Sequence, residues 1–210
     1  MKKRMFNDKF GLTYMVIQGK KTMTSDILPE LGPETELVGT NGKGEFEFRI
    51  GGNYETVSIK PKFKVGEVVA IAQNYKDAGY HPGTIQRAML KIDGVMQKGD
   101  FAMSDLPGWR NKMFVRAELM PHQIRIENVK CERLRQISEL DILKEGVLRF
   151  ERCFDDYPYV VERYIYSIPG IDCRYNSALE PFLRIVRDIF GKGTWEKNPY
   201  RIAYEFTLIQ

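Results

Sequence analysis

Three residues that are far apart in the chain have side chains suited to attacking an amide: Lys21, Thr24 and Glu145. Lys21 and Thr24 lie in the segment Gly-Lys-Lys-Thr-Met-Thr at 19–24, and Glu145 lies near the end of the segment 137–146. A desolvated lysine can take a proton from a hydroxyl group, and a carboxylate can shuttle a proton or orient the amide. If the fold joins them, they form a base, a nucleophile and an acid, or a pocket for a nucleobase. The alternative is a solvated turn and a solvated helix end.

A second group of residues combines an aromatic ring with positive charges. Its members, which share the segment 109–116, are Trp109, Arg110, Lys112 and Arg116. Cations beside an aromatic side chain are typical of a surface that contacts a nucleic-acid backbone and stacks on bases. A charged loop around a buried tryptophan is the alternative interpretation. In the first segment, Gly19, Lys20 and Thr22 accompany Lys21 as candidate ligand-binding residues.

The sequence predicts neither a metal site nor a cofactor. The only histidines, His81 and His122, have no cluster of Cys, His or acidic residues at ligand spacing around them. The three cysteines also lack metal-type spacing. No glycine-rich phosphate loop, dinucleotide fingerprint or Ser-His-Asp arrangement is apparent.

Size and composition are those of an ordinary soluble protein. The 210 residues suffice for one domain with a substantial core, and the net charge of +4 permits a nucleic-acid partner without demanding one. The longest strongly apolar run, 68–72, is too short to span a bilayer, and no signal peptide is recognised. An odd number of cysteines favours reduced thiols. We therefore expect a cytoplasmic protein without a membrane partner.

Helix signals occur at three places. Asn7 or Asp8 can cap a first helix that stops near Gly19, so that the lysine-threonine segment begins where this helix ends. Ser138 with Asp141 resembles a capping box that opens a short helix closed by Gly146. A second capping box, at Ser177 and Glu180, precedes the apolar stripe of a stronger helix that stops near 191.

Strand signals occur early, in the middle and late. Alternating or continuous apolar patterns predict strands at 46–50, 57–59, 68–72, 113–115, 124–131 and 202–208. Asp93-Gly94 predicts a hairpin turn, and 32–44 is predicted to be a loop. Because regular βαβ repeats are absent, the fold class is α+β, with a mixed or antiparallel sheet that closes towards a barrel. One domain spans 1–210, and the aromatic-rich stretch at 151–176 is interpreted as an insertion or lid, with core packing the alternative for its rings.

The order of several short motifs resembles that of the ASCH family, and in particular its longer phage- and prophage-associated members. The motifs are Gly-x-Lys-Thr-x-Thr at 19–24, Phe-Lys-Val-Gly-Glu at 63–67, Asn-Lys-Met-Phe-Val at 111–115, Met-Pro-His at 120–122, Val-Lys-Cys-Glu-Arg-Leu at 129–134, Ile-Ser-Glu at 137–139, Glu-Gly at 145–146, Gly-Thr-Trp-Glu-Lys-Asn-Pro-Tyr at 193–200 and Glu-Phe at 205–206. They are collinear over nearly the whole chain, and each is weak alone.

The resemblance implies a PUA-like mixed β-barrel with flanking helices and an RNA, nucleotide or modified-nucleoside ligand. Some compact members of the family are amidohydrolases that remove the acetyl group from N4-acetylcytidine. By this resemblance the catalytic group would be Lys21, Thr24 and Glu145. Where the family commonly has arginine after the second threonine, this chain has Ser25-Asp26, and Ala72-Gln73 replaces an Arg-Glu pair. Both departures weaken the expectation of an enzyme more than that of the fold.

Three functional hypotheses therefore follow from the sequence. The first is recognition of RNA, a nucleotide or a modified nucleoside in a cleft beside Lys21 and Thr24. The second is hydrolysis of an amide on an N-acylated nucleobase such as N4-acetylcytidine. The third is a phage or mobile-element protein that acts through a protein partner, whose identity the sequence does not indicate.

Overall fold

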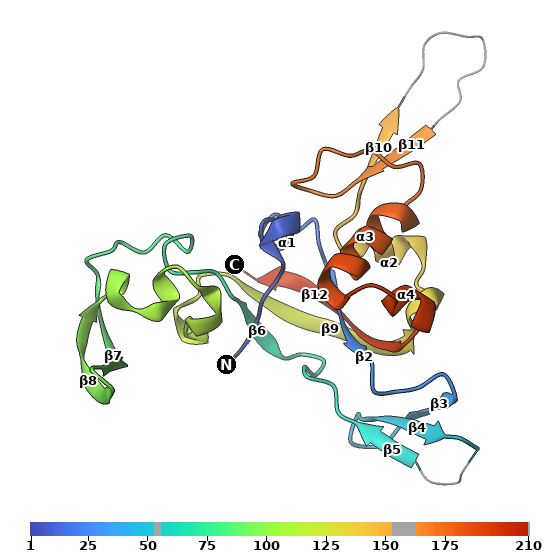
Figure 1. Ribbon diagram of the computed structural model, residues 1–210, viewed down its shortest axis with the longest axis horizontal. Helices are drawn as coiled ribbons and strands as arrows, with labels where there is room; N and C mark the ends of the chain where they lie inside the picture. The colour runs from blue at the N-terminus through green and yellow to red at the C-terminus, as the bar shows by residue number, and fades with distance from the viewer. Residues whose placement is uncertain (53–55, 153–162, 210) are drawn as a thin grey trace. The chain divides into compact units, whose positions relative to one another are not determined.

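The computed structural model describes residues 1–52, 56–152 and 163–209, and Figure 1 shows its elements in chain order. The chain forms two compact units. The first unit comprises Met1–Phe6, Val68–Ile124 and Ile209–Gln210, and the second comprises Asn7–Glu67 and Arg125–Leu208. The single domain over 1–210 stays a prediction. Residues 153–162 of the expected insertion at 151–176 lie outside the described residues.

The first unit contains a parallel strand pair and a long hairpin. β1 (Lys2–Arg4) pairs in parallel with β6 (Val68–Ile71), whose side chains are mostly buried. β7 (Ile85–Ile92) and β8 (Val95–Ala102) pair antiparallel in unbroken register. At the predicted turn Asp93 and Gly94 have φ of 49° and 85°, the two positive values that a tight hairpin turn requires. The turn prediction is confirmed.

Short 3-10 turns complete the core of the first unit. They are η2 (Met103–Asp105), η3 (Pro107–Trp109), η4 (Lys112–Phe114) and η5 (Ala117–Leu119). They pack buried apolar side chains around Tyr75, and a Cβ atom on Gly108 would approach the Tyr75 ring to 2.4 Å. The predicted strand at 113–115 is wrong, because the Asn111 side chain accepts a hydrogen bond from the Met113 N–H and opens η4 instead.

The second unit holds three sets of strands. In the first, β12 (Tyr200–Ile209) lies between β2 (Met23–Leu28), to which it is antiparallel, and β9 (Gln123–Arg133), whose residues from 125 onward belong to this unit. The second is β3 (Thr35–Thr40), β4 (Phe46–Ile50) and β5 (Thr56–Ile59). The third is the pair β10 (Leu148–Arg152) and β11 (Arg163–Ser167). The predicted loop at 32–44 is partly wrong, because 35–40 form β3 against the apolar strand β4.

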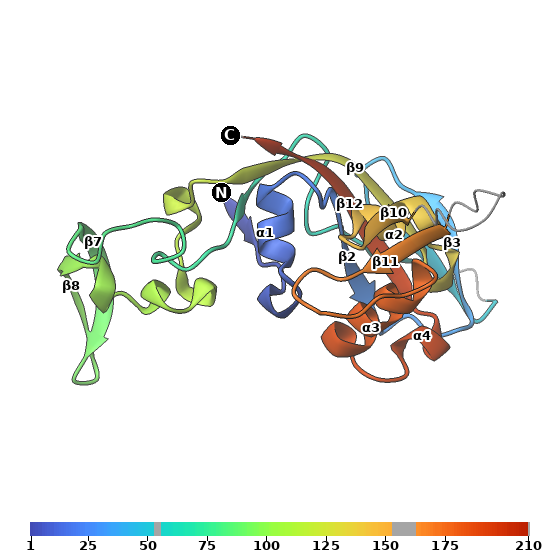
Figure 2. The same cartoon turned by 90° about the horizontal axis from the view of Figure 1, so that it is seen from above.

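The helices also belong to the second unit. They are η1 (Asp8–Phe10), α1 (Leu12–Ile17), η6 (Leu134–Gln136), α2 (Glu139–Lys144), α3 (Leu179–Phe190) and α4 (Thr194–Lys197). The predicted cap of α2 is confirmed, since the Ser138 hydroxyl accepts a hydrogen bond from the Asp141 N–H at 3.1 Å. α2 contacts both β2 and α3, and Figure 2 shows the same elements from above. α2 is thereby fixed over the strand that follows the lysine-threonine segment.

The fold is mixed α+β and consists mostly of sheet. In the part of the chain that the structure describes, the strand pairings do not close into a barrel. Among the same residues, no helix is long and apolar enough to cross a membrane.

Candidate functional site

The structure brings Lys21 and Glu145 into direct contact. The Lys21 ammonium donates to the Glu145 carboxylate at 2.8 Å and to the Glu145 carbonyl oxygen at 2.5 Å. Backbone contacts set this geometry, because the Thr22 N–H donates to the Lys144 carbonyl oxygen at the end of α2. Gly146 continues the chain with φ of 107°, and a Cβ atom there would lie 3.4 Å from Lys21 Cδ. The side chains of Lys21 and Glu145 are 2% and 11% exposed, so water contributes little to their solvation.

Ser25 and Arg201 complete the surroundings of Glu145. The Ser25 hydroxyl donates to Glu145 Oε1 at 2.6 Å and accepts a hydrogen bond from Arg201 Nη1 at 2.9 Å. The Arg201 guanidinium also lies 3.4 Å from Glu145 Oε1. Ser25 pairs with Ala203 across the strands β2 and β12, and alternation along β12 puts Arg201 on the same face as Ala203. Glu145 therefore has a lysine, an arginine and a hydroxyl group around its carboxylate.

Further charges extend this arrangement. Arg201 Nε donates to Glu132 Oε1 at 3.1 Å, and its Nη2 contacts the same oxygen. Lys130 Nζ lies 2.6 Å from Asp141 Oδ2 and 3.3 Å from Glu132 Oε2. We use the name charge cluster for three cations and three carboxylates: Lys21, Lys130, Arg201, Glu132, Asp141 and Glu145. Its formal charges balance, as burial of so many ions requires.

The charge cluster keeps the carboxylates of Glu145 and Asp141 ionised. Burial alone would raise the pKa of Glu145, but Lys21 and Arg201 together with the Ser25 hydrogen bond lower it below its ordinary value. Burial acts in the same upward direction on Asp141, and the ion pair with Lys130 outweighs it, so the pKa of Asp141 is also lowered. Cys131 lies between Lys130 and Glu132 on β9, and burial and the Glu132 carboxylate raise the pKa of its thiol to about 12. The Glu145 and Asp141 carboxylates are thus weak bases, and the Cys131 thiol is protonated near neutral pH.

Thr24, the third residue of the predicted catalytic group, is 5% exposed. It pairs with Tyr204, and because side chains alternate along a strand, it lies on the face of β2 opposite to Ser25. The Ser25 side chain, on the other face, bonds Glu145. Among the other residues of the segment, Gly19 has φ of 66° and Lys20 is exposed.

Sequence reasoning did not identify Arg201 or Ser25 as site residues. The apolar alternation of the predicted strand at 202–208 places Ile202, Tyr204, Phe206 and Leu208 on one face, and Arg201 would lie on the other face. In the structure both faces are buried, and Arg201 is 0% exposed. The signal was the run Tyr-Arg-Ile-Ala-Tyr at 200–204, since a strand covered on both faces has apolar residues at successive positions rather than alternate ones.

The residues of the predicted basic surface lie in the first unit. Trp109 is half-buried against its core, and Arg110 is exposed. The Lys112 ammonium donates to the Phe6 carbonyl oxygen, so this charge anchors the N-terminal segment. Arg116 is exposed, donates to the Arg87 carbonyl oxygen at 3.2 Å and lies 4.0 Å from the exposed Glu118.

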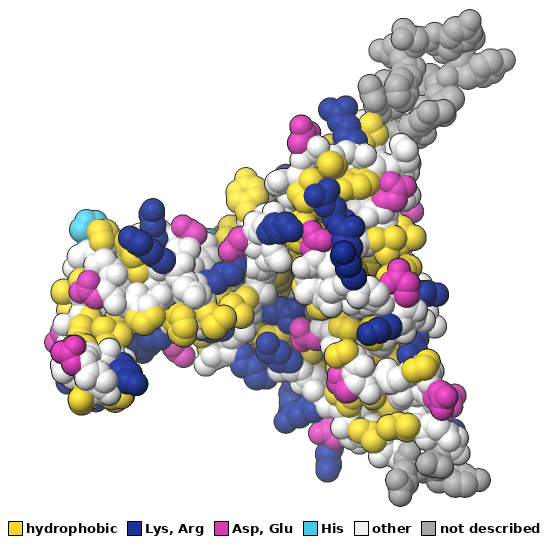
Figure 3. All heavy atoms as spheres, in the orientation of Figure 1, with side chains coloured by type: hydrophobic (Ala, Val, Ile, Leu, Met, Phe, Trp, Pro, Cys, Tyr) yellow, Lys and Arg dark blue, Asp and Glu magenta, His cyan; other side chains and the backbone are white. Residues whose placement is uncertain are grey.

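Arg116 also lines a cavity of about 470 Å³ beside the hairpin β7–β8. We call it the stacking pocket; its lining residues include Tyr75, Arg87, Lys98, Phe114 and Arg116. The Phe114 side chain is 57% exposed although it is large and apolar. The Tyr75 hydroxyl accepts a hydrogen bond from the Arg116 N–H at 3.0 Å and holds this part of the wall. In Figure 3, hydrophobic, cationic and acidic side chains are interspersed over the face of this unit that is in view.

Within the described residues, no group of three or more His, Cys, Asp or Glu side chains could hold a metal ion. Comparisons with protein-family models, with curated proteins and with solved structures found no match.

Proposed function

We propose that this protein binds single-stranded RNA through the stacking pocket, as a member of the ASCH family with a PUA-like β-barrel. The observation that carries the proposal is the exposed Phe114 ring in one cavity with the cations Arg87, Lys98 and Arg116. An exposed aromatic ring beside cations offers a base a surface on which to stack. Arg87, Lys98 and Arg116 line the same cavity as Phe114. They would therefore contact the phosphates of an RNA strand that has a base stacked on this ring.

Stacking and charge have separable roles in this proposal. A base that stacks on Phe114 contributes about 1–3 kcal/mol, whatever its identity, because every base has a flat π face. Arg87, Lys98 and Arg116 contact phosphates and make the affinity dependent on salt. A single strand is favoured over a duplex, since paired bases are not free to stack on a protein ring.

The test is binding of a fluorescently labelled oligouridine RNA, followed by anisotropy at low salt. Phe114→Ala should weaken binding by about 5- to 150-fold, which corresponds to the loss of one stacked base. Phe150→Ala is the matched control, because Phe150 is 52% exposed but lies on β10 in the second unit. Equal effects of the two variants would contradict the proposal. Absence of binding by the unaltered protein would favour the hypothesis of a protein partner instead.

A second candidate function is hydrolysis of an N-acylated nucleobase such as N4-acetylcytidine. The contact between Lys21 and Glu145 supports it, because these residues are 124 positions apart in sequence and meet at 2.8 Å. The resemblance assigns the nucleophile to Thr24, whereas the hydrogen bond to Glu145 favours Ser25. In either case the hydroxyl oxygen would attack the acyl carbon and pass its proton through the site to the departing amine. Water would then release the acyl group.

Chromatography of N4-acetylcytidine incubated with the purified protein tests this second candidate. Lys21→Ala should abolish turnover, and comparison of Thr24→Ala with Ser25→Ala identifies the nucleophile. Binding of RNA without turnover of N4-acetylcytidine would exclude hydrolysis of this substrate and support RNA binding. Turnover that persists in Lys21→Ala would exclude the proposed catalytic group.

A further inference from the structure

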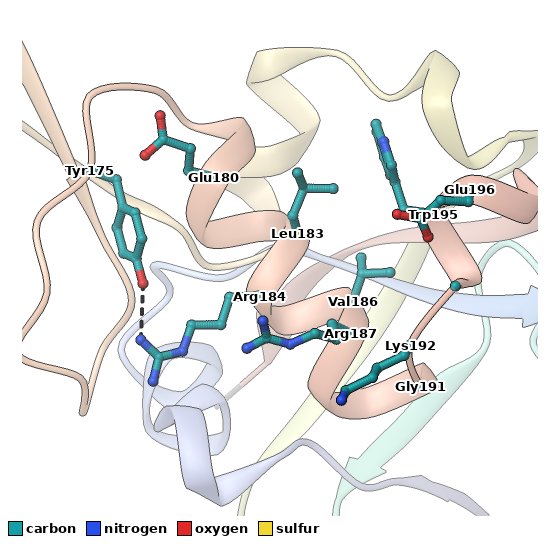
Figure 4. A pocket seen from close by; sticks show the side chains of 11 residues that line it. Tyr175, Glu180, Leu183, Arg184, Val186, Arg187, Gly191, Lys192, Trp195 and Glu196 are labelled. Carbon is teal, nitrogen blue, oxygen red and sulfur yellow. Dashed lines mark hydrogen bonds between the residues drawn. The ribbon is translucent and has the colours of Figure 1, made fainter.

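A second cavity, of about 550 Å³, lies in the other unit, along α3 and the turn that leads into α4. Figure 4 shows its lining side chains, which include Tyr175, Arg184, Arg187, Lys192 and Trp195. We propose that this cavity binds a mononucleotide. Its phosphate would contact Arg184, Arg187 and Lys192, and its base would lie against the Trp195 ring. This site is independent of the stacking pocket, which belongs to the first unit.

The cations of this cavity are arranged for a phosphate. Arg184 and Arg187 are three residues apart on α3 and therefore share one face of the helix, and their guanidinium groups point to the same side in Figure 4. Arg184 Nη1 donates to the Tyr175 hydroxyl at 3.1 Å, while its buried Nε has no hydrogen-bond partner among the described residues. The hydrogen bond to Tyr175 orients the guanidinium group, and the remaining N–H groups of a guanidinium can donate to a phosphate oxygen. Arg187 is exposed and bonds the neighbouring Asp188 at 3.1 Å.

The aromatic walls are held in place by the backbone. Tyr175 exchanges two backbone hydrogen bonds with Tyr166, both of 2.9 Å. The Trp195 carbonyl oxygen accepts a hydrogen bond from Arg135 Nε at 3.0 Å, and the preceding Thr194 hydroxyl bonds the Phe190 carbonyl oxygen at the end of α3. Walls that are ordered before binding cost less entropy when a ligand enters.

Two carboxylates restrict the ligand class further. Glu180 and Glu196 line the same cavity, and Glu180 is oriented by the Ser177 hydroxyl at 3.2 Å. Carboxylates accept hydrogen bonds from the hydroxyl groups of a ribose and repel additional phosphates. A ligand with an aromatic ring, hydroxyl groups and one phosphate satisfies all three sets of side chains. The volume is within the range that pockets for small ligands occupy.

Fluorescence of Trp195 provides the test, because the chain has two tryptophans and Trp109→Phe leaves Trp195 alone. Adenosine 5′-monophosphate should quench this fluorescence and bind at least about tenfold more tightly than adenosine, which lacks the phosphate. In the same background, Arg187→Gln and Lys192→Gln should each weaken binding of the monophosphate by about tenfold or more and leave that of adenosine unchanged. Both residues are exposed, so the variants should fold.

Lys43→Gln is the charge-matched control, since Lys43 is an exposed lysine of the same unit outside the cavity. Equal affinity for adenosine and its monophosphate would overturn the proposed role of the cations. Inorganic phosphate that binds as tightly as the monophosphate would overturn the role of the rings. Absence of any monophosphate-dependent change in fluorescence and in calorimetry would overturn the site itself.

Discussion

The charge cluster and the stacking pocket use the same kinds of side chain in opposite ways. In the cluster, Arg201 and Lys21 are buried, and carboxylates or carbonyl oxygens surround their charged groups. In the pocket, Arg87 and Arg116 are exposed at the edge of a cavity that an exposed Phe114 also lines. Burial therefore separates charges that are paired with other groups of the protein from charges at the edge of an open cavity. Residue type alone does not make this distinction.

Removal of the buried guanidinium is expected to have the largest effect. Arg201→Leu leaves the buried Glu145 and the half-buried Glu132 beside fewer cations, and loss of one partner from a buried ion pair typically costs about 3–5 kcal/mol. The free energy of unfolding, measured by urea titration, should fall by about this amount. Arg49→Leu is the control, because the Arg49 side chain is 44% exposed in a surface pair with Glu36. Similar losses in the two variants would remove the energetic distinction between buried and exposed charges.

Acid should destabilise the protein through the same cluster. The pKa values of Glu145 and Asp141 are lowered on folding from ordinary values of 4.5 and 3.8, so the folded state binds fewer protons than the unfolded state. Their stabilisation is complete above those values and is lost as the pH falls through the lower folded values. Unfolding measured between neutral pH and acid should show this loss. In Glu145→Gln, stability at neutral pH should be lower and its decrease in acid smaller, whereas a parallel curve would contradict the assignment.

Salt should distinguish the pocket from the cluster. Removal of one phosphate-binding cation from a single-stranded complex reduces the slope of log K against log salt by about 0.7. Arg116→Gln should reduce the slope for oligouridine by this amount and leave the free energy of unfolding nearly unchanged. Lys43→Gln should leave both quantities unchanged, since Lys43 is outside the pocket. An unchanged slope in Arg116→Gln would remove this residue from the proposed interface.

The smallest effect is expected at a pair of intermediate exposure. Lys144 contacts Glu205, and their side chains are 39% and 33% exposed. Pairs that remain in contact with water typically contribute about 0.2–1 kcal/mol, so Lys144→Gln should cost no more than this in a urea titration. A decrease as large as that of Arg201→Leu would show that the charge cluster extends to this pair.

Local sequence signals predicted the elements that have clear turn residues, helix caps or apolar alternation. The turn at Asp93-Gly94, the cap at Ser138 and the apolar alternation of β4 each depend on neighbouring residues, and each appears in the structure. β3 was missed because its residues at 35–40 are half polar and lie among glycines, so that only the pairing with β4 defines it. At 113–115 an apolar triplet predicted a strand, but the side chain of Asn111 determined the local structure.

The candidate site was less predictable, for a physical reason. The sequence drew attention to Lys21 and Glu145 only through the order of its motifs. Local propensity does not indicate that two residues so far apart in the chain will meet. The role of Arg201 depends on α2 covering the second face of β12, and no pattern within β12 specifies which element will lie there. Ser25 was noted only as a departure from the family pattern, although it bonds both Glu145 and Arg201. The periodicity of apolar residues along the chain does not predict tertiary contacts of this kind.

The pairing of β2 with β12 also delays completion of this sheet until late in translation. Ser25 and Arg201 are 176 residues apart, and β12 is the only strand beside β2 among the described pairings of its sheet. At about 5–20 residues per second, a ribosome needs roughly 10–35 seconds to extend the chain from one to the other. During this interval the backbone N–H and C=O groups of β2 lack the partner strand β12. Unpaired strand edges of this kind are prone to association with other chains. The topology therefore exposes β2 to association with other chains until the last strand of the sheet is made.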